Sequence, residues 1–420
     1  MAILLYSLLL HLLLPVALLR LGWRGLRNPA YWRRWSERLG AAPVLGQAGC
    51  IWLHAVSVGE TRAAVPLVRA LLQQYPGRRI LITSMTPTGS DQVRELFGSQ
   101  VEHCYVPYDL PMAVSRFLDR SRPALAVIME TEFWPNLFHQ CHARGIPLVL
   151  ANARLSERSA RGYQRFAGFT RATLANVSRV GAQSRADAER LRALGATRVD
   201  VTGSIKFEMD VPADLAARRA TLRSGFGNRP VWVAASTRVG EEEYVLDALT
   251  RLRERIPRLL LVLVPRHPER FESVAKLCLQ RGLTVERRST HRNSVAPDTA
   301  ILLGDTMGEM LLFHAVADVS YIGGSLVPLG GQNLLESLAV GTPVIFGPHM
   351  FNFSDISRLA LECRAGRRVQ NSSELVEAVA SHLENPAARN AAGEAGLRMV
   401  AENRGALDRT LGLLRSVFNA

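Results

Sequence analysis

Residues 321–348 read YIGGSLVPLGGQNLLESLAVGTPVIFGP, and this stretch decides the fold of the chain. The β-branched and aromatic run at 319–322 predicts a short strand, which a glycine-rich loop follows. Helical spacing over 332–340 and an apolar run over 342–346 predict a helix and a buried strand. A helix that opens from a glycine loop points backbone N–H groups toward phosphate. The stretch therefore predicts one strand–loop–helix–strand step of an α/β sheet with an anion site.

The side chains of this stretch suggest which anion. Asn333 and Glu336 are three residues apart, so both can face the loop from one side of the helix. A carboxylate there can accept hydrogen bonds from ribose hydroxyls, which makes a nucleotide-sugar site the first hypothesis. The alternative is a crowded turn that binds no ligand. The glycines of the loop are Gly323, Gly324, Gly330 and Gly331.

The composition fits a globular protein with a basic surface. The chain has 420 residues, enough for two domains, and a formal net charge of +14. Charge alone does not distinguish phospholipid, nucleic acid and phosphorylated substrates as partners. Its only lysines are Lys206 and Lys276, and its five cysteines are scattered without metal-ligand spacing. With no Walker A or G-x-G-x-x-G sequence either, the chain lacks the signatures of P-loop, dinucleotide and zinc sites.

The amino terminus predicts an uncleaved membrane anchor over 1–24. Residues 2–19 are almost entirely apolar, and a cluster of arginines follows them, which places the body in the cytoplasm. A cleaved signal peptide is a weaker alternative, because no charged segment precedes the apolar run. A third possibility is a helix that enters one leaflet, with Trp23, Tyr31, Trp32 and Trp35 at the interface.

The first half of the chain alternates predicted strands and helices, as in a parallel sheet covered by helices. Ligands of such sheets bind at the carboxyl ends of the strands. One such end is HAVSVGE at 54–60, where Glu60 is a candidate general base beside Ser57 and Gly59. The pair Ser57 and Glu60 also fits a helix-capping box, and the motif alone favours the cap. The predicted strands are 51–56, 79–83, 124–129, 147–151 and 179–182.

Two further features of this half carry charge. Glu130 and Glu132 follow an apolar strand, where they can bind sugar hydroxyls, tune a neighbouring base or cap the next helix. A basic helix comes next, and the spacing of its arginines aligns them on one face. Such a face suits an anionic membrane or lipid phosphates, although it can equally be a solvated surface. The arginines are Arg154, Arg158, Arg161 and Arg165.

The second half starts a new alternation after a polar connection at 211–229. Two doubly wound sheets predict two lobes that face each other across a cleft. Polar residues again follow the strands: Ser236 and Thr237, then Arg266 and His267, then the segment 304–309. Because they share an edge with the glycine loop, they predict one binding site. The new strands are expected at 231–237, 259–264, 283–286, 299–303, 319–322 and 342–346.

The assembled motifs closely resemble the lipid A-specific 3-deoxy-D-manno-octulosonic acid (Kdo) transferases. The resemblance covers nearly the whole chain. Besides the anchor and residues 321–348, it rests on HAVSVGE, METEFWPN, GSIKFE, AASTRVGEEE, PRHPER and GDTMGEM. It implies an α/β fold of the GT-B type with two Rossmann-like domains, at 25–212 for the acceptor and 213–420 for CMP-Kdo.

The resemblance also implies the reaction. It predicts an inverting glycosyltransferase that moves Kdo from CMP-Kdo to a lipid A precursor, lipid IVA. It implies no cofactor and no metal, a location at the bacterial inner membrane with its anionic lipids, and no nucleic acid partner. The alternatives are a related GT-B enzyme with a UDP-sugar donor, and a non-catalytic basic binder of membranes or nucleic acid.

Roles follow from the resemblance by motif position. Glu60 becomes the catalytic base, in contrast to the reading from its motif alone. The neighbourhood of the acceptor contains Ser57, Gly59, Glu130, Glu132, Arg154, Arg158, Arg161 and Arg165. The donor-binding residues are Lys206, Ser236, Thr237, Arg266, His267, Met307, Gly308, Glu309, Gly323, Gly324, Ser325, Asn333 and Glu336.

Overall fold

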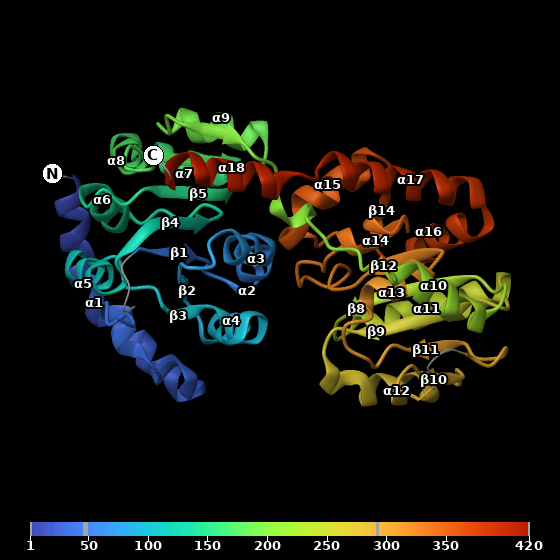
Figure 1. The fold of residues 1–420 in the computed structure, drawn as a ribbon. Coiled ribbons are helices and arrows are strands. Elements are labelled where there is room, and N and C mark those ends of the chain that lie inside the picture. The colour runs from blue at the N-terminus through green and yellow to red at the C-terminus, as the bar shows by residue number, and fades with distance from the viewer. Residues whose placement is uncertain (1, 45–48, 291–293, 419–420) are drawn as a thin grey trace. The chain divides into compact units, whose positions relative to one another are not determined.

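The computed structural model describes residues 2–44, 49–290 and 294–418. The chain forms two compact units (Figure 1). The N-terminal unit contains Met1–Glu208 together with Arg404–Ala420, and the C-terminal unit contains Met209–Asn403.

The N-terminal unit is built on a sheet of seven parallel strands in the order β3-β2-β1-β4-β5-β6-β7. All five strands expected in this half are present. The short strands β3 and β7 are additional, because half-exposed edge strands lack the apolar run that identifies a buried one. The strands are β1 Cys50–His54, β2 Ile80–Ser84, β3 Glu102–Tyr105, β4 Pro123–Met129, β5 Leu148–Ala153, β6 Arg179–Ala182 and β7 Val199–Val201.

Helices follow the strands of this unit. Four of them begin at a serine or threonine whose hydroxyl accepts the amide three residues later, at Ser57, Thr86, Ser156 and Ser184. The helices are α1 Ala2–Arg27, α2 Val58–Ala63, α3 Val65–Gln74, α4 Pro87–Phe97, α5 Pro111–Ser121, α6 Pro135–Ala143, α7 Glu157–Gln164, α8 Ala167–Leu174, α9 Arg185–Ala193 and α18 Ala406–Phe418. Short 3-10 turns are η1 Pro29–Trp32, η2 Trp35–Leu39, η3 Gly98–Gln100 and η4 Ile205–Phe207.

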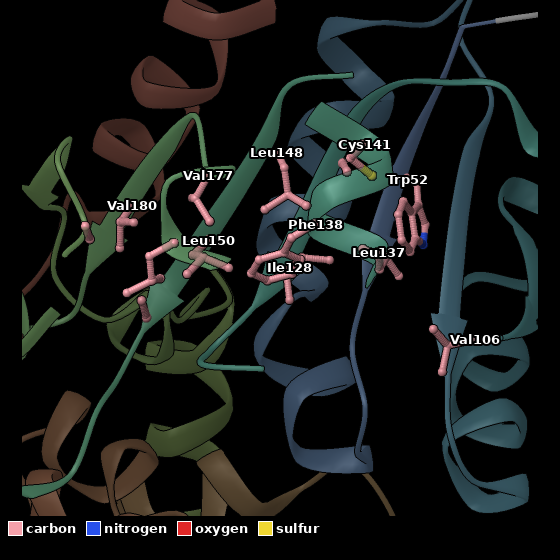
Figure 2. Close-up of a cluster of buried hydrophobic side chains, with 14 of the residues drawn as sticks. Trp52, Val106, Ile128, Leu137, Phe138, Cys141, Leu148, Leu150, Val177 and Val180 are labelled. Atoms are coloured by element: carbon pink, nitrogen blue, oxygen red, sulfur yellow. The ribbon is translucent and has the colours of Figure 1, made fainter. Parts of the chain in front are cut away.

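The sheet of this unit is buried on both faces. Trp52, Ile128 and Leu150 point to one face, where they meet Leu137 and Phe138 of α6 (Figure 2). Their chain neighbours point to the other face, toward α3 and α18. Strands covered on both sides read as continuous apolar runs, which explains why the sequence revealed them.

The C-terminal unit has a second parallel sheet of seven strands, in the order β10-β11-β9-β8-β12-β13-β14. The strands are β8 Val231–Thr237, β9 Leu260–Pro265, β10 Val285–Arg287, β11 Ile301–Leu303, β12 Val319–Ile322, β13 Val344–Phe346 and β14 Gly366–Arg368. The helices are α10 Leu215–Phe226, α11 Glu241–Arg255, α12 Phe271–Gln280, α13 Met310–Val316, α14 Leu335–Ala339, α15 Ser354–Glu362, α16 Ser372–Glu384 and α17 Pro386–Glu402, with turns η5 Pro268–Arg270 and η6 Phe351–Phe353. Two doubly wound sheets confirm the predicted fold class.

The stretch at 321–348 folds in the expected order, but its helix is shorter than expected. The strand β12 matches its prediction, and the loop glycines Gly324, Gly330 and Gly331 have positive φ angles. The helix is α14 alone, because the Asn333 side chain accepts the amide of Leu335 at 3.1 Å and starts the helix late. Only its first residues therefore lie near the loop.

The end of the chain corrects the predicted domain limits of 25–212 and 213–420. The helix α18 packs on the N-terminal unit, where Leu411, Leu413 and Leu414 join its core. The Arg409 guanidinium donates to the Thr202 carbonyl oxygen at 2.8 Å and fixes the same helix. Its apolar spacing predicts a helix with one buried face, but spacing does not say which sheet that face will cover.

The predicted N-terminal anchor is the helix α1. It is 26 residues long, and among the described residues it is the one helix that is long and apolar enough to cross a membrane. Its mean hydropathy is 2.4 over the most apolar window, and it is almost entirely exposed. These properties are compatible with a membrane anchor.

Candidate active site

Glu60 lies in the first turn of α2, directly beyond the carboxyl end of β1. Its Oε2 accepts the amide of Val56 at 2.8 Å, and its Oε1 accepts the Ser57 hydroxyl at 3.0 Å. The Glu60 amide donates to Ser57 Oγ at 3.3 Å. The capping box considered for this pair is therefore formed, and the same contacts hold the carboxylate at the strand end.

The surroundings of Glu60 suit a proton acceptor. Burial raises its pKa to about 7, and the negative charges of Glu130 and Glu132 add to the rise. The hydrogen bonds from Val56 and Ser57 act in the opposite direction, but they do not cancel it. A carboxylate with a pKa close to neutral can remove a proton far better than an ordinary glutamate. Glu60 therefore forms the capping box, and its pKa lies in the range that proton transfer at neutral pH requires.

Two more acidic residues stand beside Glu60, at the end of β4. Glu130 has a φ angle of 56°, in the left-handed region that non-glycine residues rarely adopt. Such strained residues concentrate at functional sites. Burial raises the pKa of Glu132, and the charge of Glu130 raises it further. Glu60, Glu130 and Glu132 therefore interact electrically, as their neighbouring strand ends predicted.

Lys206 belongs to this acidic group. Its Nζ lies 3.2 Å from Oε1 of Glu130. The turn η4 that carries Lys206 is fixed by Asn152, whose Oδ1 accepts the amide of Ile205 at 3.0 Å. The resemblance assigned Lys206 to the donor-binding residues, and the structure places it in the N-terminal unit, within the predicted limits of 25–212. Its contact there balances one of the carboxylate charges around Glu60.

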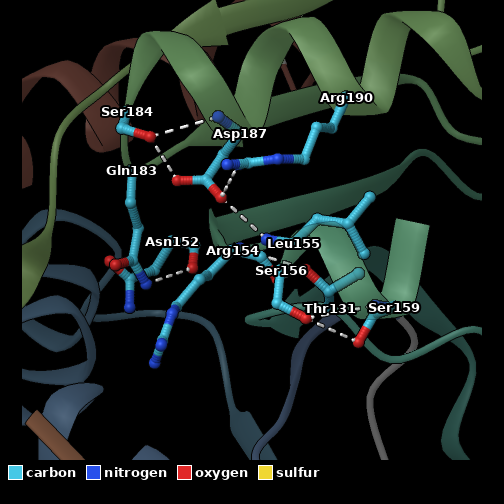
Figure 3. Close-up of polar contacts among 10 residues, drawn as sticks. All are labelled: Thr131, Asn152, Arg154, Leu155, Ser156, Ser159, Gln183, Ser184, Asp187 and Arg190. Atoms are coloured by element: carbon cyan, nitrogen blue, oxygen red, sulfur yellow. Dashed lines mark hydrogen bonds and ion pairs between the residues drawn. The ribbon is translucent and has the colours of Figure 1, made fainter. Parts of the chain in front are cut away.

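The predicted arginine face is only partly present. The helix α7 starts after Ser156, whose hydroxyl accepts the amide of Ser159 at 3.1 Å, so Arg154 precedes the helix. Figure 3 shows the Arg154 side chain pointing away from the network of Ser184, Asp187 and Leu155. The alignment of four arginines is therefore wrong for Arg154, because a serine cap begins the helix later than the spacing alone suggests.

The other three arginines gather as expected. Arg158, Arg161 and Arg165 line a surface cavity of about 430 Å³ together with Gly162. All three side chains belong to exposed residues. Three guanidinium groups around one hollow form a site suited to phosphate, because arginine binds phosphate oxygens with paired, charge-assisted hydrogen bonds.

In the C-terminal unit, Glu241 occupies the amides of the glycine loop. Its carboxylate accepts the amides of Gly324 at 2.5 Å and Ser325 at 2.9 Å. Gly323 donates instead to the carbonyl oxygen of Ala235 at 2.8 Å. The predicted phosphate contact through these three backbone groups is therefore not available, because an internal carboxylate already satisfies two of them and a strand carbonyl the third.

The remaining strand ends of this unit do meet. The Arg266 amide donates to the Thr237 carbonyl oxygen at 3.0 Å, and the Arg266 Nε donates to Gln332 Oε1 at 3.3 Å. Ser236 has a φ angle of 56°. Thr237 is fully buried, and its Oγ1 has no partner within the described part of the chain.

The side chains of the other predicted donor-binding residues differ in their contacts. Arg288 holds the Glu309 carboxylate with two hydrogen bonds of 2.8 and 3.0 Å, so Glu309 shapes its turn. His267 contacts Arg238, and burial lowers its pKa, as does that guanidinium. The Asn333 side-chain amide donates to Glu336 at 3.2 Å, so the two side chains lie together at the start of α14, although Asn333 precedes the helix. Met307 is exposed beside Gly308, whose φ angle is positive.

Sequence reasoning missed two residues of this site. Glu241 had a place only within a motif, although a glutamate four residues after a strand end, at the start of a helix, can accept the amide three residues before it. Gln332 follows the loop glycine Gly331, and no local pattern indicated its contact with Arg266. Both contacts join segments that are far apart in the sequence, which explains why periodicity did not reveal them.

Comparison with known proteins identifies the family. The family model of 3-deoxy-D-manno-octulosonic-acid transferase (kdotransferase) matches residues 33–209. The 3-deoxy-D-manno-octulosonic acid transferase of Haemophilus influenzae is 41% identical over 98% of this chain and 97% of its own length. The enzyme of that name from Bordetella pertussis is 40% identical over 97% and 98%, respectively.

A solved structure supports the architecture. The Anabaena protein HepE in complex with UDP is 14% identical, and the likeness covers 89% of this chain and 100% of that protein with a TM-score of 0.55. At this identity the likeness shows the GT-B fold alone. The full-length identity to the two bacterial transferases goes further, and it favours Kdo over the UDP-sugar alternative. This chain belongs to the 3-deoxy-D-manno-octulosonic acid transferases, and it is a glycosyltransferase.

Proposed function

We propose that the chain transfers Kdo from CMP-Kdo to lipid IVA with inversion of configuration, and that Glu60 is the general base. The observation that carries this proposal is the half-buried carboxylate of Glu60, whose pKa of about 7 results from burial and from its two acidic neighbours. Full-length identity to Kdo transferases supports the sugar, and the acidic strand ends support the role.

The reaction is a single displacement. Glu60 takes the proton of an acceptor hydroxyl, and the hydroxyl oxygen forms a bond to the anomeric carbon of Kdo. The bond between this carbon and the phosphate oxygen breaks, and CMP leaves with the electron pair. Attack opposite the leaving group inverts the anomeric carbon. A base with a pKa close to 7 is ionised at neutral pH and still basic enough to take the proton.

Side chains, rather than the glycine loop, would meet the charge of the leaving phosphate. The loop amides are used by Glu241, whereas Arg266 stands at the neighbouring strand end with a guanidinium suited to phosphate. Asn333 and Glu336 offer polar groups for the nucleotide at the same edge of the sheet. Lys206 stays a predicted donor residue. Under this proposal the reaction requires no metal ion.

The arginine cavity supports a phosphorylated acceptor. A lipid A precursor is an acylated disaccharide with phosphate groups, and Arg158, Arg161 and Arg165 surround a hollow of about 430 Å³. We place the acceptor phosphate there. The apolar helix α1 and the arginines that follow it support a location at the inner membrane, with the body on the cytoplasmic side.

The test is a transfer assay with the detergent-solubilised full chain. CMP-Kdo, made in situ, is offered with a tetraacylated lipid A precursor, and the product is weighed by mass spectrometry. We expect a mass gain of one or more Kdo units, equally in the presence of EDTA. A gain with a UDP-sugar but none with CMP-Kdo would refute the donor, and loss of transfer in EDTA would refute metal independence.

A further inference from the structure

The helix α1 is attached to the N-terminal unit near its own amino end. The Tyr6 hydroxyl donates to Oδ2 of Asp109 at 3.0 Å, and the Ser7 hydroxyl donates to Oδ1 of Asn136 at 2.9 Å. Asp109 also accepts the amides of Asn136 and Leu137 at the start of α6, at 3.0 and 2.8 Å. The contact point is thus part of the folded body, and Figure 1 draws α1 next to α6.

The other end of α1 is attached to the same unit. The Trp32 indole donates to the carbonyl oxygen of Gly22 at 3.1 Å, and it packs so closely on Gly25 that a Cβ there would clash. Two residues after Trp32, the Arg34 guanidinium donates to Ser90 Oγ at 2.7 Å. The short connection from Trp32 to Arg34 therefore keeps the carboxyl end of α1 close to the body.

These two attachments conflict with a helix that crosses the membrane. Ser7 and Arg27 are 20 residues apart, which is about 30 Å along a helix, and this equals the thickness of the hydrocarbon core. In a spanning helix with its arginines in the cytoplasm, Ser7 would lie at the opposite boundary. Asp109 and Asn136, which bind this end of α1, would then also lie at that boundary. The folded N-terminal unit that contains them would have to lie there as well. We propose that α1 lies parallel to the membrane plane, within one leaflet.

The exposed side chains of α1 indicate that this helix is covered by the leaflet of an anionic phospholipid membrane. Apolar side chains remain exposed along the whole helix: Leu4, Leu5, Leu8, Leu9, Leu12, Leu13, Val16, Leu19, Trp23 and Leu26. Exposed arginines follow at Arg20, Arg24, Arg27 and Arg33, and no acidic residue precedes Glu37. The Arg27 guanidinium lies 4.1 Å from the Trp23 ring centre, and tryptophan is enriched at the interface between membrane and water.

The attachment at Ser7 can be tested by a disulfide. The variant Ser7→Cys with Asn136→Cys, in a Cys363→Ser background, is expressed as the full chain, and its membranes are oxidised with copper phenanthroline. The other native cysteines are buried. We expect peptide mass spectrometry to find the 7–136 disulfide in most molecules, and none in the matched pair Leu13→Cys with Asn136→Cys. Equal amounts in both pairs, or none in either, would overturn the proposal.

A second measurement does not depend on that pair. Ala2→Cys, at an exposed position, is treated in spheroplasts with a membrane-impermeant maleimide, with the exposed Ala216→Cys as the control that is labelled only after lysis. Protection of Ala2→Cys in membrane-bound protein supports a helix within one leaflet. Labelling from the periplasmic side, or recovery of the chain in the soluble fraction, overturns it. The inference rests on the proposed membrane location, but neither readout requires Kdo transfer.

Discussion

The two sheets carry the same tripeptide at the same place, with different results. Val58-Gly59-Glu60 follows β1, and Val239-Gly240-Glu241 follows β8, and each of these is the first strand of its sheet in the chain. Both glutamates lie at the start of a helix, and both accept a backbone amide a few residues upstream. Sequence alone assigns them the same position and the same capping function.

Glu60 and Glu241 differ in their tertiary contacts. Glu241 is 0% exposed and accepts five hydrogen bonds, whereas Glu60 is partly exposed and accepts two. Glu60 faces two further carboxylates, which help to raise its pKa to about 7. The donors to Glu241 are Arg238, Tyr321, Gly324, Ser325 and Leu326. A carboxylate saturated with donors is a structural anchor, whereas one surrounded by like charge is ready to accept a proton.

The largest effect should come from Glu60→Gln, which tests whether this residue is more than a cap. Glutamine at this position keeps the capping box, because its carbonyl oxygen still accepts the Val56 amide. It cannot take a proton, so we expect transfer to fall by about 10²–10⁴-fold. The measurement is the transfer rate in the mass-spectrometric assay. CMP-Kdo binding is measured separately, and we expect it to be unchanged. The matched control is Glu189→Gln, an exposed position on α9. Near-normal transfer by folded Glu60→Gln would reduce Glu60 to a cap.

Glu241→Ala should instead act on stability. It leaves the amides of Gly324, Ser325 and Leu326 buried without an acceptor, which we expect to cost about 3–5 kcal/mol in the free energy of unfolding. The measurement is the thermal midpoint of the C-terminal unit, and Glu243→Ala, an exposed neighbour on α11, is the control with little expected change. A midpoint equal to that of the control would show that Glu241 is not the anchor of the loop.

The difference between the two glutamates marks the limit of the sequence. Apolar runs such as 124–129 and 231–237 predicted most of the strands, because a strand that is buried on both faces consists mainly of apolar residues. Glu60, Glu130 and Glu132 were found because strand ends converge in a parallel sheet. The role of Glu241 was not found, since three of its donors are 83 to 85 residues away. A motif indicates where a side chain begins, and tertiary contacts decide what it does.

The same limit applies to the chain termini. The sequence analysis ended the N-terminal domain at residue 212, and it did not reveal that α18 covers the N-terminal sheet. The hydropathy of α1 predicted contact with a membrane, but it left open a spanning helix and a helix within one leaflet. The polar contacts of Tyr6 and Ser7 distinguish these possibilities, and no periodicity reveals a hydrogen bond to a residue 103 or 129 positions away.

Glu130→Gln tests whether the neighbouring negative charge raises the pKa of Glu60. The negative charge of Glu130 raises the pKa of Glu60, and the substitution removes this charge. Because the base acts when deprotonated, wild-type kcat/KM should fall as the pH drops through about 7. In the variant this limb should move to lower pH, whereas Glu189→Gln leaves it in place. An unmoved limb would mean that another group titrates in the profile.

The smallest effect should be a gain in stability, and it has the opposite sign to that of Glu241. The pKa of Glu60 is about 7 in the folded chain against an ordinary 4.5, so between these values the folded state binds more protons than the unfolded state. Stability is therefore lost as the pH rises from 4.5 through 7. Glu60→Gln removes this loss of stability. It should raise the thermal midpoint of the N-terminal unit at pH 8 by about 2–4 °C, or about 1 kcal/mol, with little change at pH 4.5.

Glu241→Gln should lower the midpoint of its own unit at pH 8, because the amide group turns an N–H toward donors. A loss of stability in both variants would mean that Glu60, like Glu241, is kept for the fold, whereas opposite signs identify it as a charge that the fold tolerates for catalysis.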